Sequence, residues 1–179
     1  SATFCSLCNQ IAASGILSNT LRTGDVLVVG ECTATVLAPD HEYTDVNDTS
    51  LVLDLQCGEV NFLLTGDSNL DVAVPAEILK VAHHGSSTAT SGAYLDAVVP
   101  QAAIISVGLD NTYGHPNQEV LDRLSLRGVD VYRTDELGTI TVTTDGNTFS
   151  VAPALTQQPM CYLPLVMGPV ALPSTPMPT

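Results

Sequence analysis

The densest run of chemically useful side chains in this sequence is Lys-Val-Ala-His-His-Gly-Ser, at residues 80–86. His83 and His84 follow an apolar segment and enter a Gly-Ser turn. Asp67 ends the preceding apolar segment in the same way, sixteen residues before His83. Imidazole nitrogens and carboxylate oxygens at neighbouring strand ends are ligands that a divalent metal such as zinc takes. The spacing therefore predicts a metal site, although tight-turn chemistry alone is the competing explanation for each residue.

A third histidine occurs in a similar context. His115 lies in Tyr-Gly-His-Pro, a turn-like segment after another apolar run, and turn chemistry explains it equally well. Together with Asp67 and His84 it gives at most three ligands, which suits one catalytic zinc that keeps an open position for water. The remaining histidine, His41, is interpreted as a solvated loop residue.

The elements that must position these side chains alternate between helices and strands, and several strands come as hairpins. This pattern predicts a mixed α/β layer arrangement rather than a purely parallel sheet. Helices are expected at residues 3–14, 70–77, 91–98 and 116–126, and strands at 25–29, 34–37, 50–55, 60–64, 78–82, 102–107, 129–133, 139–143 and 148–151.

Composition limits the partners of the chain. Its 179 residues suffice for one domain with a sizeable core, and 19 acidic against 5 basic residues give a net charge of −14. A surface of that sign repels phosphate backbones, so nucleic acid is an unlikely partner of this chain alone. No apolar run is long enough for a membrane-spanning helix. A start at Ser1 suggests processing or a missing upstream part.

The five cysteines leave the redox compartment undecided. Cys5 and Cys8 form a Cys-x-x-Cys without the second pair that a four-thiolate zinc site needs. The helical spacing of Leu7, Cys8 and Ile11 favours Cys8 as a small apolar core residue, with a redox or disulfide role as the alternative.

The last part of the chain differs from the rest. We divide the sequence into residues 1–152 and an uncharged, proline-rich tail at residues 153–179. The apolar segment 160–167 is interrupted by proline, so it cannot form a regular helix or a central strand. It is also too apolar for a solvated linker. We expect it to lie along the surface of its own domain or to dock on another subunit.

Six blocks together resemble the metallo-β-lactamase-fold domain of the ComEC-type hydrolases, over roughly residues 3–145. Their order and spacing carry the resemblance more than any single block does. The blocks are Asn-Asp-Thr-Ser-Leu-Val at 47–52, Thr-Gly-Asp at 65–67, Leu-Lys-Val-Ala-His-His-Gly-Ser at 79–86, Ile-Ile-Ser-Val-Gly at 104–108, Tyr-Gly-His-Pro at 113–116 and Arg-Thr-Asp at 133–135.

The resemblance implies a role for each matching position. Asp67 matches a carboxylate that bridges two metals, and His84, with His83 as its rival, matches the histidine that follows it in the family. His115 is implied as a metal ligand or a substrate contact. Ser86, Asn111 and Asn47 are implied as residues that support the ligands or contact the substrate.

One family motif is absent. The first metal of the family is held by a His-x-(His or Asp)-x-Asp-His loop, and this sequence has no such loop. The chain therefore resembles the C-terminal half of a four-layer αββα sandwich. We expect one or two zinc or manganese ions, with the first-site ligands outside this chain. We also expect the missing N-terminal half, or another subunit, to cover the open sheet face.

Two functions follow from this comparison. The first is part of a metal-dependent hydrolase that cleaves a phosphodiester or similar ester outside the cytoplasm, with Asp67 and His84 as the catalytic residues. The second is a non-catalytic, self-assembling extracellular or cell-envelope module, a homo-oligomer whose apolar tail docks on a neighbouring subunit.

Overall fold

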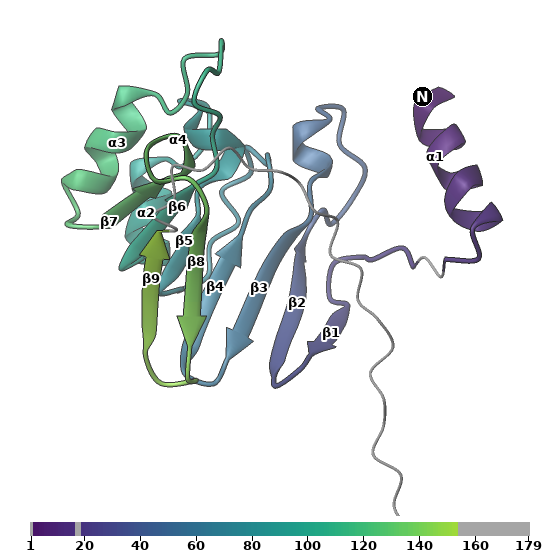
Figure 1. Ribbon diagram of the computed structural model, residues 1–179, viewed down its shortest axis with the longest axis horizontal. Coiled ribbons are helices and arrows are strands. Elements are labelled where there is room, and N and C mark those ends of the chain that lie inside the picture. The colour runs from purple at the N-terminus through teal and green to yellow at the C-terminus, as the bar shows by residue number, and fades with distance from the viewer. Residues whose placement is uncertain (1, 17–18, 154–179) are drawn as a thin grey trace, which may run out of the picture.

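A seven-stranded sheet forms the centre of the computed structural model, which describes residues 2–16 and 19–153 (Figure 1). The strands follow one another in the sheet in sequence order. They are β1 (Val26–Val29), β2 (Cys32–Ala38), β3 (Val52–Cys57), β4 (Val60–Leu64), β5 (Ile78–Lys80), β6 (Ala102–Ile105) and β7 (Asp130–Arg133). A separate two-stranded sheet pairs β8 (Ile140–Thr144) with β9 (Phe149–Pro153).

The large sheet is mixed, as the sequence predicted. Strands β1 to β4 pair antiparallel through hairpins and one longer connection, whereas β4 to β7 pair parallel. Parallel neighbours need crossover connections, and helices supply part of these. The expected α/β arrangement, with hairpins and flanking helices, is confirmed.

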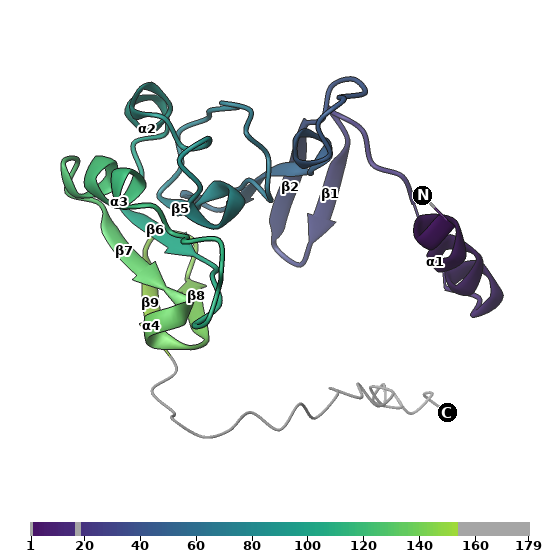
Figure 2. The ribbon, with the colours of Figure 1, turned by 90° about the horizontal axis from the view of Figure 1, so that it is seen from above.

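The two faces of this sheet are covered differently. The helices α2 (Gly92–Val98) and α3 (Gln118–Ser125) lie on one face, and the β8–β9 hairpin lies on the other (Figures 1 and 2). Leu63, Leu79 and Ala103 are paired across β4, β5 and β6 and are fully buried in the core beneath the helices. On the hairpin side, the paired Leu55 and Phe62 are only half-buried.

The helices end where their local sequence dictates. The Ser91 hydroxyl accepts a hydrogen bond of 3.1 Å from the Tyr94 backbone N–H, so Ser91 caps α2 as expected. Leu124 directs α3 into the core and is fully buried. Shortly after α3, Gly128 adopts a φ of +66°, which glycine tolerates best.

Residues 70–77 are not helical, and this expectation was wrong. The segment is irregular, and Leu70, Val72 and Val74 pack against the core from it. Two β-branched valines followed by Pro75 disfavour a helix, and packing of these side chains against the core sets the path of the segment.

A helix does form at α1 (Ala2–Ala13), but its expected buried face is absent. Among the described residues, Cys8 is a free, exposed thiol and Leu7 is 52% exposed, because α1 stands apart from the sheet (Figure 1). The interpretation of Cys8 as a core residue was therefore wrong. A period of 3.6 residues shows which side of a helix is apolar, but not whether the chain supplies a surface to cover it.

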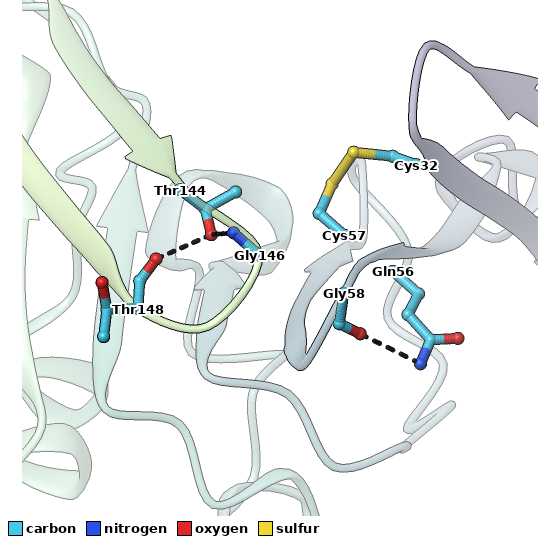
Figure 3. The surroundings of a disulfide bond; sticks show 7 residues. All are labelled: Cys32, Gln56, Cys57, Gly58, Thr144, Gly146 and Thr148. Carbon is cyan, nitrogen blue, oxygen red and sulfur yellow. Dashed lines mark hydrogen bonds between the residues drawn. A yellow bond between two sulfur atoms is a disulfide. The ribbon is translucent and has the colours of Figure 1, made fainter.

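A disulfide between Cys32 and Cys57 was not anticipated from the sequence (Figure 3). Thr33 pairs with Gln56, so the cysteines are the next residues opposite each other on β2 and β3, with their Cα atoms 4.4 Å apart. That separation is typical of the closer type of antiparallel pair, whose side chains can be bridged. The bond therefore closes a loop that contains both strands.

The tail at residues 154–179 lies outside the described residues, as do the expectations placed on it. Among the residues that are described, no helix combines the length and apolar character needed to cross a bilayer.

Loss of the disulfide is predicted to destabilise the fold. The cysteines are 25 residues apart, and loss of the cross-link that closes a loop of this size should lower the free energy of unfolding by about 3.5 kcal/mol. Urea unfolding with and without a reductant measures this difference. Cys57→Ser should match the reduced protein, whereas Cys8→Ser should leave the midpoint unchanged. A midpoint insensitive to reduction would contradict the prediction.

Candidate metal centre

The predicted site residues follow the carboxyl ends of three neighbouring strands. Asp67 comes after β4, His83 and His84 come after β5, and His115 comes after β6. Because β4, β5 and β6 are parallel, these ends meet at one edge of the sheet. Ligands of open parallel sheets commonly bind at this edge.

The two histidines occupy an unusual turn. His83 has φ 47° and His84 has φ 55°, so two side-chain-bearing residues adopt the left-handed region in succession, and Gly85 continues it at φ 81°. Each such non-glycine residue costs on the order of 1–2 kcal/mol. The turn is held by hydrogen bonds from the His83 N–H to the Gly66 carbonyl (3.1 Å) and from the Ser86 N–H to the His83 carbonyl (2.9 Å). Local strain of this kind clusters at functional sites.

His84 is oriented toward Asp67. Its Nδ1 lies 2.6 Å from the Ser106 carbonyl, and because a carbonyl only accepts, Nδ1 carries the proton. In a neutral imidazole the lone pair is then on Nε2, which lies 3.3 Å from Asp67 Oδ1. A metal ion or a hydrogen-bonding proton between these two atoms makes such an approach favourable.

The geometry of this pair fits zinc. Two ligand atoms at about 2.0–2.1 Å from zinc and at a tetrahedral angle are about 3.3 Å apart. The His84 and Asp67 side chains are 45% and 44% exposed, so an ion can reach both. A hydrogen bond from the far ring nitrogen to a backbone carbonyl is also the usual support of a metal-binding histidine.

Asp67 is held by the loop before β3. Gly66 has φ +55°, and its Cα packs so closely on Ser50 that an added Cβ would lie 2.9 Å from the Ser50 Cβ. The Asp67 N–H donates to Ser50 Oγ at 3.2 Å, and the Asn69 N–H donates to Asp48 Oδ1 at 2.9 Å. Asn47 was the predicted supporting residue, but Asp48 and Ser50 make these contacts.

His83 is supported through a chain of polar side chains. Its Nδ1 lies 3.3 Å from Asn69 Oδ1, which also accepts a hydrogen bond of 2.8 Å from the Thr88 hydroxyl. Ser86 is buried, and its hydroxyl lies 2.9 Å from Thr88 Oγ1. The structure therefore places Ser86 two side chains away from His83, where it is positioned to support the turn.

His115 is positioned by Asn111. The Asn111 amide donates to the His115 carbonyl at 2.8 Å, and its oxygen accepts from the His115 N–H at 3.0 Å. The next residue, Pro116, packs on Gly85, where an added Cβ would lie 2.6 Å from the proline Cβ. The His115 and His83 ring centroids are 5.8 Å apart. His115 Nδ1 is buried and has no hydrogen-bond partner among the described residues.

Lys80, at the end of β5, brings an amino group close to Asp67. Burial lowers the pKa of its ammonium group, and the nearby Asp67 carboxylate opposes that shift. Lys80 Nζ donates to the Val81 carbonyl at 2.8 Å, and the Lys80 carbonyl accepts from the Thr65 hydroxyl. This lysine is the only one in the chain, and it lies at the end of β5, next to the segment that leads to Asp67.

The predicted ligands form two pairs in the described part of the chain. Asp67 and His84 face each other, whereas His83 and His115 contact each other through their rings. Within residues 2–16 and 19–153, no group of three or more His, Cys, Asp or Glu side chains is arranged to hold a metal ion. Asn69, Asp48 and Ser50 were missed by sequence reasoning, because loops that are distant in the sequence bring them to the site.

Comparisons with known proteins address the family. No protein-family profile matches the sequence. ComE operon protein 3 of Bacillus subtilis is 36% identical over 136 residues, which are 70% of this chain and 18% of that protein. Competence protein ComA of Neisseria gonorrhoeae is 35% identical over 108 residues, covering 54% of this chain and 15% of that protein. The chain belongs to the ComEC-type family.

Recombination protein 2 of Haemophilus influenzae is a further relative, 35% identical over 97 residues, covering 50% of this chain and 12% of that protein. The chain thus spans less than a fifth of the length of each of these relatives. Among solved structures, a mutant of CmlA beta-hydroxylase superposes with a TM-score of 0.44 at 12% identity, over 69% of this chain and 34% of that one. The relatives confirm the resemblance to the ComEC-type family, each over a part of its own length.

The contact between Gly85 and Pro116 yields a prediction. Gly85→Ala forces a left-handed alanine and a clash with the proline, so it should destabilise the fold by more than about 2 kcal/mol. Gly114→Ala is a matched control, because Gly114 has φ +72° but no atom within 4 Å of an added Cβ; it should cost only about 1 kcal/mol. Urea unfolding measures both. Equal losses would show that the contact is unimportant.

Proposed function

We propose that this chain supplies one wall of the active site of a metal-dependent hydrolase that acts on a phosphodiester or similar ester. The observation that carries the proposal is the approach of His84 Nε2 to Asp67 Oδ1, with the other His84 nitrogen committed to a backbone carbonyl. Membership of the ComEC-type family supports it. The acidic chain favours a small phosphoester or a cell-envelope ester over a nucleic acid.

Each side chain has a distinct role in this proposal. Asp67 and His84 hold zinc or manganese, and a bound ion of this type lowers the pKa of a coordinated water and polarises the ester. His115 lies beside His83 and contacts the substrate or completes the ligand set. The Asn111 side chain positions His115 by a hydrogen bond to the His115 backbone, and the Asn69 side chain positions the His83 ring.

The remaining ligands come from a second segment, which belongs either to the same polypeptide or to another chain. The half-buried side chains on the β8–β9 side of the sheet, among them Leu53, Leu55, Phe62 and Leu64, provide the surface on which that segment packs. Burying such a surface is also what completes a sandwich. The Cys32–Cys57 disulfide supports an exported location, because such bonds persist in oxidising compartments.

Metal titration tests the proposal on the chain itself. Zinc and manganese should bind the purified chain, as measured by calorimetry and by the His84 ring signals in NMR. Asp67→Ala and His84→Ala should each weaken binding at least about tenfold, because each removes one of two facing ligands. His41→Ala serves as the control, since His41 pairs with Asp40 in an exposed loop. Binding that is unchanged in both site variants would contradict the assignment.

Activity is expected only when the second segment is present. In a protein that contains both segments, Asp67→Ala should abolish metal-dependent phosphodiester hydrolysis, whereas His41→Ala should leave it unchanged. Retained hydrolysis in the Asp67 variant would overturn the hydrolase proposal.

A non-catalytic module is the second candidate. It is favoured by the half-buried apolar side chains on the β8–β9 side of the sheet, which a neighbouring subunit would cover. Metal analysis separates the candidates, because a structural module would purify without stoichiometric zinc or manganese and would not bind either in the titration.

A further inference from the structure

Strand β1 is a free apolar edge of the large sheet. It is the first strand in the sheet order, and within residues 2–16 and 19–153 it pairs with β2 alone. Its sequence, Val-Leu-Val-Val, carries no charge, and Val26, Val28 and Val29 are 58%, 78% and 58% exposed. Edge strands are usually protected by charge, proline or a covering segment. None of these protects β1 within the described part of the chain.

The backbone groups that face outward from β1 follow from its pairing. The Val36 N–H donates to the Asp25 carbonyl at 2.9 Å, so residue 25 points toward β2. Because alternate residues of a strand direct their backbone groups to the same side, Leu27 and Val29 also face β2. The N–H and C=O groups of Val26 and Val28 therefore point to the free edge.

The uncharged tail is the occupant that fits this edge. All charged residues of the chain lie between Arg22 and Asp145, so the tail brings no charge to an uncharged strand. A second copy of the chain would instead approach with a net charge of −14 against the same charge. Apolar side chains in the tail, such as Leu163 and Val166, match the exposed valines of β1.

The tail is also long enough. The described part of the chain ends at Pro153, and 26 residues follow. Six strand spacings of about 4.8 Å make the large sheet about 29 Å wide. Ten extended residues reach about 33 Å, so residue 163 of the same chain can arrive at β1. An intramolecular strand has an effective concentration on the order of millimolar, which favours its pairing over that of a second copy.

We propose that residues 163–167 of the tail pair with β1 of the same chain as an eighth strand. This segment reads Leu-Pro-Leu-Val-Met. Pro164 has no N–H, so it must face away from β1. Leu163, Leu165 and Met167 then direct their backbone groups toward Val26 and Val28, and the N–H of Val166 faces solvent.

Amide hydrogen exchange in the full-length chain tests the pairing. The Val26 and Val28 amides should exchange at least about tenfold more slowly in the unmodified chain than in Leu165→Pro, which removes an inward donor. Val166→Pro is the matched control, because it removes only an outward N–H and should keep the protection. The Leu27 and Val29 amides, which face β2, should exchange equally in all three proteins.

Two results would overturn the proposal. Equal exchange of the Val26 and Val28 amides in the unmodified chain and in Leu165→Pro would show that the tail does not pair with β1. Protection that grows with protein concentration would show that a second copy, and not the chain's own tail, covers the edge.

Discussion

Parallel pairing of β4, β5 and β6 is the constraint on which the rest of the molecule depends. It aligns three carboxyl ends at one edge, and the segments that leave those ends carry Asp67, His83, His84 and His115. Parallel strands are stable when both faces are covered, and here helices cover one face and the β8–β9 hairpin covers part of the other. The rigidity of the sheet edge that carries the site therefore depends on how well the helices and the hairpin pack on β4, β5 and β6.

The loops at this edge hold one another in place. Gly66 fits against Ser50, and Gly85 fits against Pro116, so two glycines allow backbones from separate loops to touch. The left-handed conformation of His83 and His84 is maintained by the Gly66 carbonyl, which belongs to the segment that carries Asp67. Ligand orientation is thus a property of the assembled edge and not of the His-His-Gly-Ser sequence alone.

The sequence was sufficient to predict the family and the mixed sheet, because motif spacing and strand patterns are local properties. It left open whether His83 or His84 faces Asp67, since the Ser106 carbonyl that orients His84 lies 22 residues away in the sequence. It was insufficient for Cys32 and Cys57, since five cysteines allow many pairings and only the β2–β3 register places these two opposite each other. It also missed Asn69 and Asp48, whose contact joins two loops 21 residues apart. Residues 70–77 were mistaken for a helix because burial against the core, and not local propensity, sets their path.

The pair formed by His84 and Asp67 has a consequence for regulation. Both side chains are almost half exposed. His84 is held by the Ser106 carbonyl and the Asp67 backbone by the Ser50 hydroxyl, so the pair has its geometry before the second segment binds. In the proposed hydrolase, two ligands alone would let an ion come and go quickly, and only the assembled domain would retain it. Hydrolysis would then depend on assembly, and a chain without its second segment would not cleave esters while it folds.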